Sequence, residues 1–154
     1  MTVEQKRDEL QQHYLGTRAE LLNSLEGLSP EQLQEPTLDA GWSVKDLLAH
    51  IAQWDELRLL EMGRVAAGYQ PAYRGMTAEQ VEASNALSVE LRRVLPMQQV
   101  MWELASARQR LLDFAAQADE RTLDNANYGN APPRTSHDLL HADQIRRWRQ
   151  ERGY

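Results

Sequence analysis

The chain has 154 residues and a net charge of −6 at pH 7. This length allows one substantial hydrophobic core, and the acidity argues against nucleic-acid binding, for which a basic patch is typical. The chain has no cysteine, which excludes disulfides and thiolate ligands. It has neither an apolar run of about 18 residues for a membrane span nor the apolar region of a signal peptide. We expect one cytoplasmic domain over residues 1–154.

The first long helix is predicted from Thr2 to Leu28. Thr2 and Gln5 have the spacing of a capping box at its start. Apolar residues then recur at steps of three, four and seven, as one face of a helix requires: Leu10, Tyr14, Leu21, Leu25 and Leu28. Ser29 and Pro30 begin a short turn, and a loop follows from Pro36 to Gly41.

The second long helix is predicted from Ser43 to Gly68. Ser43 and Asp46 form its cap, and Gly68 ends it. One face carries Leu47, Ile51, Trp54 and Arg58. A loop covers residues 69–76.

Three more helices are predicted in the second half of the chain. Thr77 caps a shorter one that runs to Val94, and Pro96 separates it from a long helix over Met97 to Ala118. Turn-forming residues fill 124–134, and the last helix runs from Thr135 to Arg152. No segment alternates as a strand would. The fold class is therefore all-α, a bundle of four main helices with an extra short helix between the second and third.

The last helix carries a pair of histidines four residues apart. Residues at this spacing point in nearly the same direction, and Ile145 and Trp148 continue the direction of His137 and His141. Two adjacent buried imidazoles cannot easily satisfy each other, whereas a divalent metal would satisfy both. In the alternative interpretation, a rotated helix turns both rings to solvent as ordinary polar residues.

A metal would need at least one further ligand, because open catalytic sites usually have three. His50 lies along the edge of the apolar face of the second long helix, and His13 lies on the border of that of the first. His50 is the better third ligand. Zinc and nickel are the ions that we expect first at such a site.

Two segments resemble the motifs of the DinB/YfiT-like metalloenzymes. GWSVKDLLAHIAQWDE at 41–56 is similar to the family's first motif, in which a Trp-Ser cap opens the second helix and a histidine follows. HDLLHADQI at 137–145 resembles its second motif, a histidine pair followed by Gln and an aliphatic residue. The resemblance implies a metal triad of His50, His137 and His141.

The same resemblance carries expectations for fold, assembly and activity. It implies a four-helix bundle in up-down-down-up order, with a crossover through 69–95, and a homodimer. It also implies a metal-dependent enzyme that acts on a small molecule, such as a transferase of a low-molecular-weight thiol cosubstrate. A metal-dependent hydrolase and a non-catalytic stress-response or small-molecule-binding module are the alternatives.

Several polar residues beside the triad remain open to more than one interpretation. Trp54, Arg58 and Gln144 could line a substrate pocket. Arg58 could instead pair with an acid such as Glu103, which we favour. Asp55 and Glu56 could orient the ligating histidines or act as a general base.

Four arginines gather at the end of the chain: Arg146, Arg147, Arg149 and Arg152. Cations are favoured near a helix C-terminus, which we prefer to an anion-binding patch.

Overall fold

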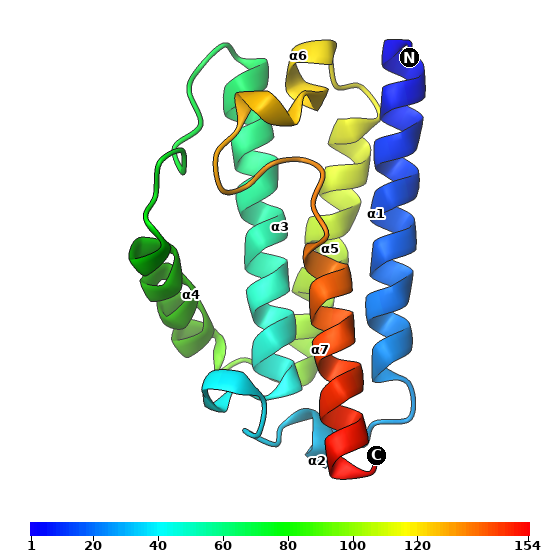
Figure 1. Ribbon diagram of the computed structural model, residues 1–154, viewed down its shortest axis with the longest axis vertical. Helices are drawn as coiled ribbons and strands as arrows, with labels where there is room; N and C mark the ends of the chain where they lie inside the picture. Colours follow the sequence, from blue (N-terminus) through cyan, green and yellow to red (C-terminus); the bar gives the residue numbers. More distant parts are fainter.

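A computed structural model describes all residues, 1–154, and shows an all-helical protein built on four long helices. These are α1 (Val3–Leu25), α3 (Val44–Ala66), α5 (Met97–Ala115) and α7 (His137–Arg152). In Figure 1, α1 and α7 run from top to bottom, whereas α3 and α5 run from bottom to top. This confirms the predicted all-α bundle and its up-down-down-up order. No helix is both long and apolar enough to cross a membrane.

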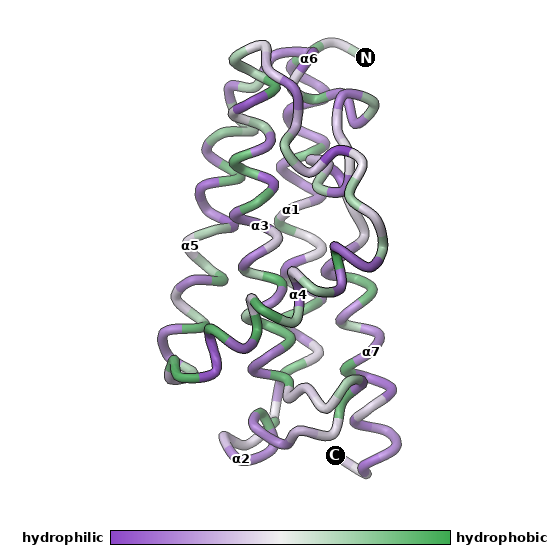
Figure 2. The backbone as a smooth tube through the Cα atoms, turned by 90° about the vertical axis from the view of Figure 1, so that its left-hand side faces the viewer, coloured by the Kyte–Doolittle hydropathy of each residue, from purple (hydrophilic) through white to green (hydrophobic).

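Five short elements connect the long helices. They are α2 (Pro30–Leu33), η1 (Asp39–Gly41), α4 (Ala78–Arg92), α6 (Glu120–Leu123) and η2 (Asn125–Asn127). Because α3 and α5 are parallel, the chain must return along the bundle between them, and α4 lies on this return path. It runs obliquely across the bundle in Figure 2 and packs against α3.

The helix starts were predicted better than the helix ends. The side chains of Thr2, Ser29, Ser43 and Thr77 all form the capping bonds expected of them. The first helix ends at Leu25 rather than Leu28, because the chain turns through Gly27, whose φ is +82°. The third long helix likewise ends at Ala115 rather than Ala118. One start also differs, because the last helix begins at His137 rather than Thr135.

The core consists of two main apolar clusters, with buried charges between them along the bundle, and a third small cluster of Trp54, Leu57 and Ala131. The larger cluster lies toward the α2 end and includes Leu48, Leu104 and Ile145. The smaller cluster lies toward the α6 end and includes Tyr14 and Leu111. Between these positions along the four helices, five buried charged residues meet: Arg18, Asp55, Arg58, Arg108 and Asp138.

The loop before α7 packs tightly against the loop after α3, and this contact leads to a prediction. A Cβ atom on Gly129 would clash with the backbone of Arg74 at its Cα, so Gly129→Ala requires a backbone shift. We expect a loss of about 1–3 kcal/mol in the free energy of unfolding, as for other overpacked sites. Urea denaturation measures this loss.

Gly16→Ala is the matched control, because Gly16 lies within α1 with no atom near its added Cβ. Alanine should leave stability unchanged there or raise it by up to about 1 kcal/mol. If both variants behaved alike, the two loops would not be in close contact.

Candidate metal centre

Three histidine side chains from two helices converge on one point. The Nε2 atom of His137 lies 3.0 Å from the Nε2 of His50 and 3.0 Å from the Nε2 of His141. The ring of His50 is 5% exposed, and the other two are half-buried. The structure thus brings together the three histidines chosen from the sequence, in a group that could hold a metal ion.

The spacing of these nitrogen atoms suits a divalent metal. With bonds of about 2.0–2.1 Å, two imidazole ligands of a tetrahedral zinc ion lie roughly 3.4 Å apart. Hydrogen bonds alone satisfy the group poorly, because each Nε2 carries either one proton or one lone pair. His137 Nε2 therefore cannot serve two neighbours equally. The donor set fits a metal that accepts one lone pair from each ring.

Helix α3 positions His50 through its capping box. Ser43 Oγ accepts a hydrogen bond from the Asp46 backbone N–H at 3.1 Å, and the Asp46 carboxylate accepts one from the Ser43 N–H at 3.0 Å. These bonds fix the first turn of α3. His50 follows on the second turn, facing α7.

The start of α7 is held by residues of α1. His13 Nε2 lies 2.7 Å from the carbonyl oxygen of Thr135, so this nitrogen carries the proton and donates it. The hydroxyl of Tyr14 donates to the carbonyl of Pro133 at 2.7 Å. His13 therefore fixes the backbone just before His137 and lies outside the triad.

Gln144 orients one of the three rings. His141 Nδ1 donates to Gln144 Oε1 at 2.8 Å, and Gln144 Nε2 donates in turn to an oxygen of Asp39 at 3.2 Å. With its proton on Nδ1, His141 presents the Nε2 lone pair to the centre of the triad. The Nδ1 atoms of His50 and His137 are buried without a partner.

Burial keeps the three imidazoles neutral. Loss of water, together with the smaller effects of the neighbouring His141 and Arg58, lowers the pKa of His50 to about 3. Burial also lowers the pKa of His137, where Arg58 contributes the largest charge effect. The pKa of His141 is lowered by burial too, against the hydrogen bond to Gln144. Neutral imidazole is the form that binds metal.

We predict that the metal-free protein loses stability as the pH falls from about 7 to about 5.5. The imidazoles have a pKa near 6.5 in the unfolded chain and a lower pKa in the fold. Below pH 6.5 the unfolded chain therefore binds more protons, which favours unfolding. Each imidazole that stays neutral should remove about 1 kcal/mol over this interval. Urea denaturation at both pH values measures the loss.

His50→Leu provides the control for this prediction, because it removes one of the three imidazoles whose pKa is lowered in the fold. Its stability should depend less on pH than that of the wild type. For His50 the loss stops only where the folded imidazole itself titrates, at a pKa of about 3. A wild-type stability that stayed constant from pH 7 to 5.5 would mean that the imidazoles bind protons in the fold as readily as in the unfolded chain.

Trp54 and Arg58 lie on α3, on the side of His50 toward the α6 end. The ring centre of Trp54 is 6.5 Å from that of His50 and 6.2 Å from that of His137. The indole N–H of Trp54 donates to Asn85 of α4 at 2.7 Å. The guanidinium of Arg58 lies 6.0 Å from the Trp54 ring centre.

The ion pair expected for Arg58 forms, but with a different partner. Arg58 binds Asp55, one turn before it, at 3.1 Å, whereas Glu103 lies 3.5 Å from Arg92. The expectation of Glu103 was wrong because sequence spacing alone does not show which acidic residue of another helix lies level with Arg58 along the bundle axis.

The two carboxylates considered as partners of the histidines, Asp55 and Glu56, bind other groups. Asp55 is 0% exposed and binds Arg18, Arg58 and Arg108. Glu56 faces Arg92 and Arg110 at 3.7 and 3.8 Å. Neither makes a hydrogen bond to a triad histidine.

Sequence reasoning missed the members of the buried charge cluster other than Asp55 and Arg58. Arg18 lies between Tyr14 and Leu21, and Arg108 lies between Leu104 and Leu111, within the apolar faces of their helices. A charged residue within an apolar face is the feature of the sequence that could have indicated the cluster. Asp138, next to His137, binds both arginines at 2.8 and 3.1 Å.

The terminal arginines mainly tie α7 to neighbouring segments. Arg146 pairs with Glu20 at 2.9 Å, and Arg152 pairs with Glu35 at 3.0 Å. Arg149 donates to the carbonyl oxygens of Ser24 and Glu26. Three of the four terminal arginines thus bind groups of this chain itself.

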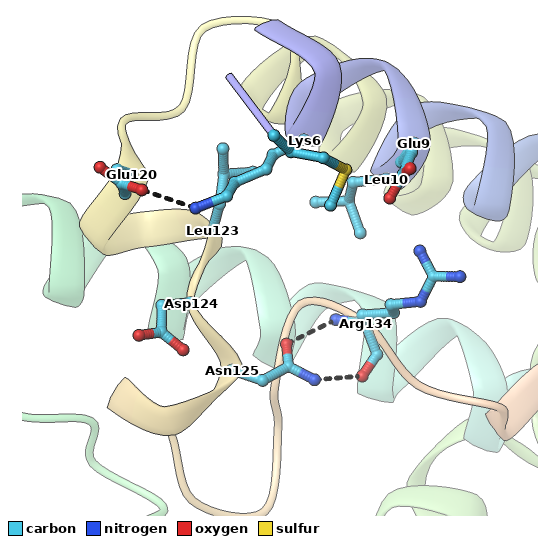
Figure 3. A pocket seen from close by; sticks show the side chains of 9 residues that line it. Lys6, Glu9, Leu10, Glu120, Leu123, Asp124, Asn125 and Arg134 are labelled. Carbon is cyan, nitrogen blue, oxygen red and sulfur yellow. Dashed lines mark hydrogen bonds and ion pairs between the residues drawn. The ribbon is translucent and has the colours of Figure 1, made fainter. Parts of the chain in front are cut away.

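A hollow of about 510 Å³ lies at the other end of the bundle, near the start of α1 and α6. Figure 3 shows that Lys6 reaches Glu120 across it and that Asn125 holds the backbone of Arg134. Lys6, Glu120 and Asn125 thus bind other residues of the lining. It contains no histidine, and we do not assign it a ligand.

Comparison with known proteins agrees with this geometry. No curated protein sequence matches the chain. The structure is similar to the crystal structure of an uncharacterised protein from Escherichia coli UTI89, with a TM-score of 0.74 and 16% sequence identity, over 96% of this chain and 94% of that one. The sequence profile of the DinB superfamily matches residues 13–145, a span that includes every histidine of the triad. The chain therefore belongs to the DinB superfamily.

Proposed function

We propose that the protein is a metal-dependent enzyme that transfers a low-molecular-weight thiol to an electrophilic small molecule. The observation that carries the proposal is the convergence of three neutral Nε2 atoms, 3.0 Å apart in two of the three pairs. Neutral ligands leave the full charge of a divalent ion in place, and three of them leave a position for another molecule.

The chemistry that a bound divalent ion would supply is Lewis acidity, which lowers the pKa of a thiol or water beside it. The residues of the chain prepare the site for this. His50, His137 and His141 would hold the ion, while Gln144 keeps the His141 proton on Nδ1. The Trp42 ring, 5.3 Å from the ring of His50, helps to keep bulk water away.

The transfer needs no reagent other than the thiol and the electrophile. The thiol loses its proton to solvent, and its sulfur forms a bond to the electrophilic carbon. The leaving group departs with the electron pair of the bond that breaks. Both substrates must be small, since the histidines are at least half-buried.

The test is a metal-dependent thiol transfer. Protein loaded with zinc or nickel is mixed with cysteine or bacillithiol and chlorodinitrobenzene, and formation of the thioether is followed by absorbance. We expect turnover that disappears on chelation and in His137→Ala. Ester hydrolysis that needs the metal and no thiol would favour the hydrolase instead. Strong stabilisation by metal without turnover in either assay would favour a non-catalytic module.

The homodimer stays a prediction from the family resemblance. Light scattering tests it, because a dimer has twice the chain mass of 17.7 kDa. A mass of one chain across a wide concentration range would contradict it.

A further inference from the structure

The buried charge cluster contains more positive than negative charge. Three arginines, Arg18, Arg58 and Arg108, meet two aspartates, Asp55 and Asp138. All five side chains are buried. One positive charge is therefore left uncompensated in a region that water does not reach, where an unpaired charge is costly.

The uncompensated charge belongs to Arg58. Arg18 donates to Asp55, to Asp138 and to the carbonyl of Leu104. Arg108 binds both aspartates and the carbonyl of Tyr14. Arg58, although only 3% exposed, makes one bond, from Nη1 to Asp55. Its Nε–H is buried without a partner.

Arg58 is also linked to the histidines through the ring of Trp54. Its guanidinium is next to the Trp54 ring, which in turn lies 6.2 Å from the His137 ring. Its charge lowers the pKa of all three triad histidines. An anion bound by Arg58 would therefore sit near the candidate metal centre.

We propose that Arg58 is the anion-binding residue of this site and that the substrate carries a small anionic group, a carboxylate, which pairs with its free N–H groups. A carboxylate would supply the missing negative charge and would accept charge-assisted hydrogen bonds from the guanidinium. The identity of the substrate rests on the proposed function, whereas the anion site can be tested without metal.

The first test uses metal-free protein with formate as the probe. Unfolding in urea is followed at increasing sodium formate, with the ionic strength held constant by the bulky anion of morpholinoethanesulfonate. We expect the folding equilibrium constant of the wild type to rise in proportion to formate, about elevenfold at ten times the dissociation constant. Arg58→Met should show no rise, and Arg58→Lys should keep part of it.

The stability of Arg58→Met without formate separates this role from a structural one. The substitution removes the uncompensated charge, and Asp55 keeps Arg18 and Arg108 as partners. We therefore expect Arg58→Met to be at least as stable as the wild type. The proposal would be overturned if the folding equilibrium constant of Arg58→Met were several-fold lower than that of the wild type. It would also be overturned if formate stabilised Arg58→Met as much as the wild type.

Arg64→Met is the matched control. Arg64 also lies on α3 and also binds an acid one turn before it, Glu61, but its side chain is 38% exposed. The response of this variant to formate should equal that of the wild type. If Arg64→Met lost the response as Arg58→Met does, formate would be acting on arginines of α3 in general, and the proposal would be wrong.

A second test identifies which substrate carries the carboxylate, in protein loaded with metal. Cysteine has a carboxylate and cysteamine lacks it. If the thiol carries the anion, kcat/KM favours cysteine in the wild type and this preference disappears in Arg58→Met. If the electrophile carries it, Arg58→Met loses activity equally with both thiols, and only for anionic electrophiles. Equal activity of Arg58→Met and the wild type in all combinations would overturn the substrate assignment.

Discussion

Asp55→Ala is expected to lower the free energy of unfolding by about 3–5 kcal/mol, as is typical when one partner of a buried ion pair is removed. Asp55 is fully buried and contacts three guanidinium groups, at 2.7 Å from Arg18, 3.0 Å from Arg108 and 3.1 Å from Arg58. Without it, only Asp138 would face three cations. Urea denaturation at neutral pH measures the effect.

Glu56→Ala is the control for this prediction. Glu56 is the next residue and also faces two arginines, but at 3.7 and 3.8 Å and with a side chain that is 32% exposed. Ion pairs of this kind contribute about 0–1 kcal/mol. If Asp55→Ala were as mild as Glu56→Ala, the charge cluster would not be the closed network described above.

His137→Ala is expected to have the largest effect on metal binding. His137 Nε2 is the atom within 3.0 Å of both other ligand atoms, so its removal leaves two separated imidazoles. We expect each of His50→Ala, His137→Ala and His141→Ala to weaken binding by more than about 100-fold. Gln144→Ala, which removes an outer partner, should weaken it by about 10–100-fold. Calorimetric titration with zinc measures these affinities.

His13→Ala is the control within the same residue type. Its ring binds the carbonyl of Thr135, so the variant should lose some stability and keep its metal affinity. If His13→Ala abolished binding while His50→Ala left it intact, the choice of the third ligand would be wrong. If no histidine variant changed the affinity, the pair on α7 would be ordinary helix histidines.

Local chemistry made much of the fold predictable. Capping residues such as Ser43 and Thr77 act on the turn that follows them, so their side chains mark helix starts directly in the sequence. The i, i+4 spacing of His137 and His141 likewise fixes their common direction within one helix. The place of His50 along an apolar face favoured it over His13, and the family motifs supported this choice, since no local rule states which faces of two distant helices meet.

The charge cluster could not be derived in the same way. Its members come from four helices: Arg18, Asp55 with Arg58, Arg108 and Asp138. Within its own helix, each of these residues is only a charged residue near an apolar face, and long charged side chains often reach solvent from such positions. Whether these residues meet depends on how the four helices are aligned along the bundle axis. The partner assigned to Arg58 was wrong for the same reason.

X-ray absorption of the protein with one equivalent of zinc tests the central claim most directly. We predict one ion per chain, bound by three imidazole nitrogens at about 2.0–2.1 Å and by an oxygen atom from solvent. Added thiol should replace that atom with a sulfur at about 2.3 Å. A closed shell of four protein ligands that excludes thiol, or an ion bound without imidazole, would contradict it.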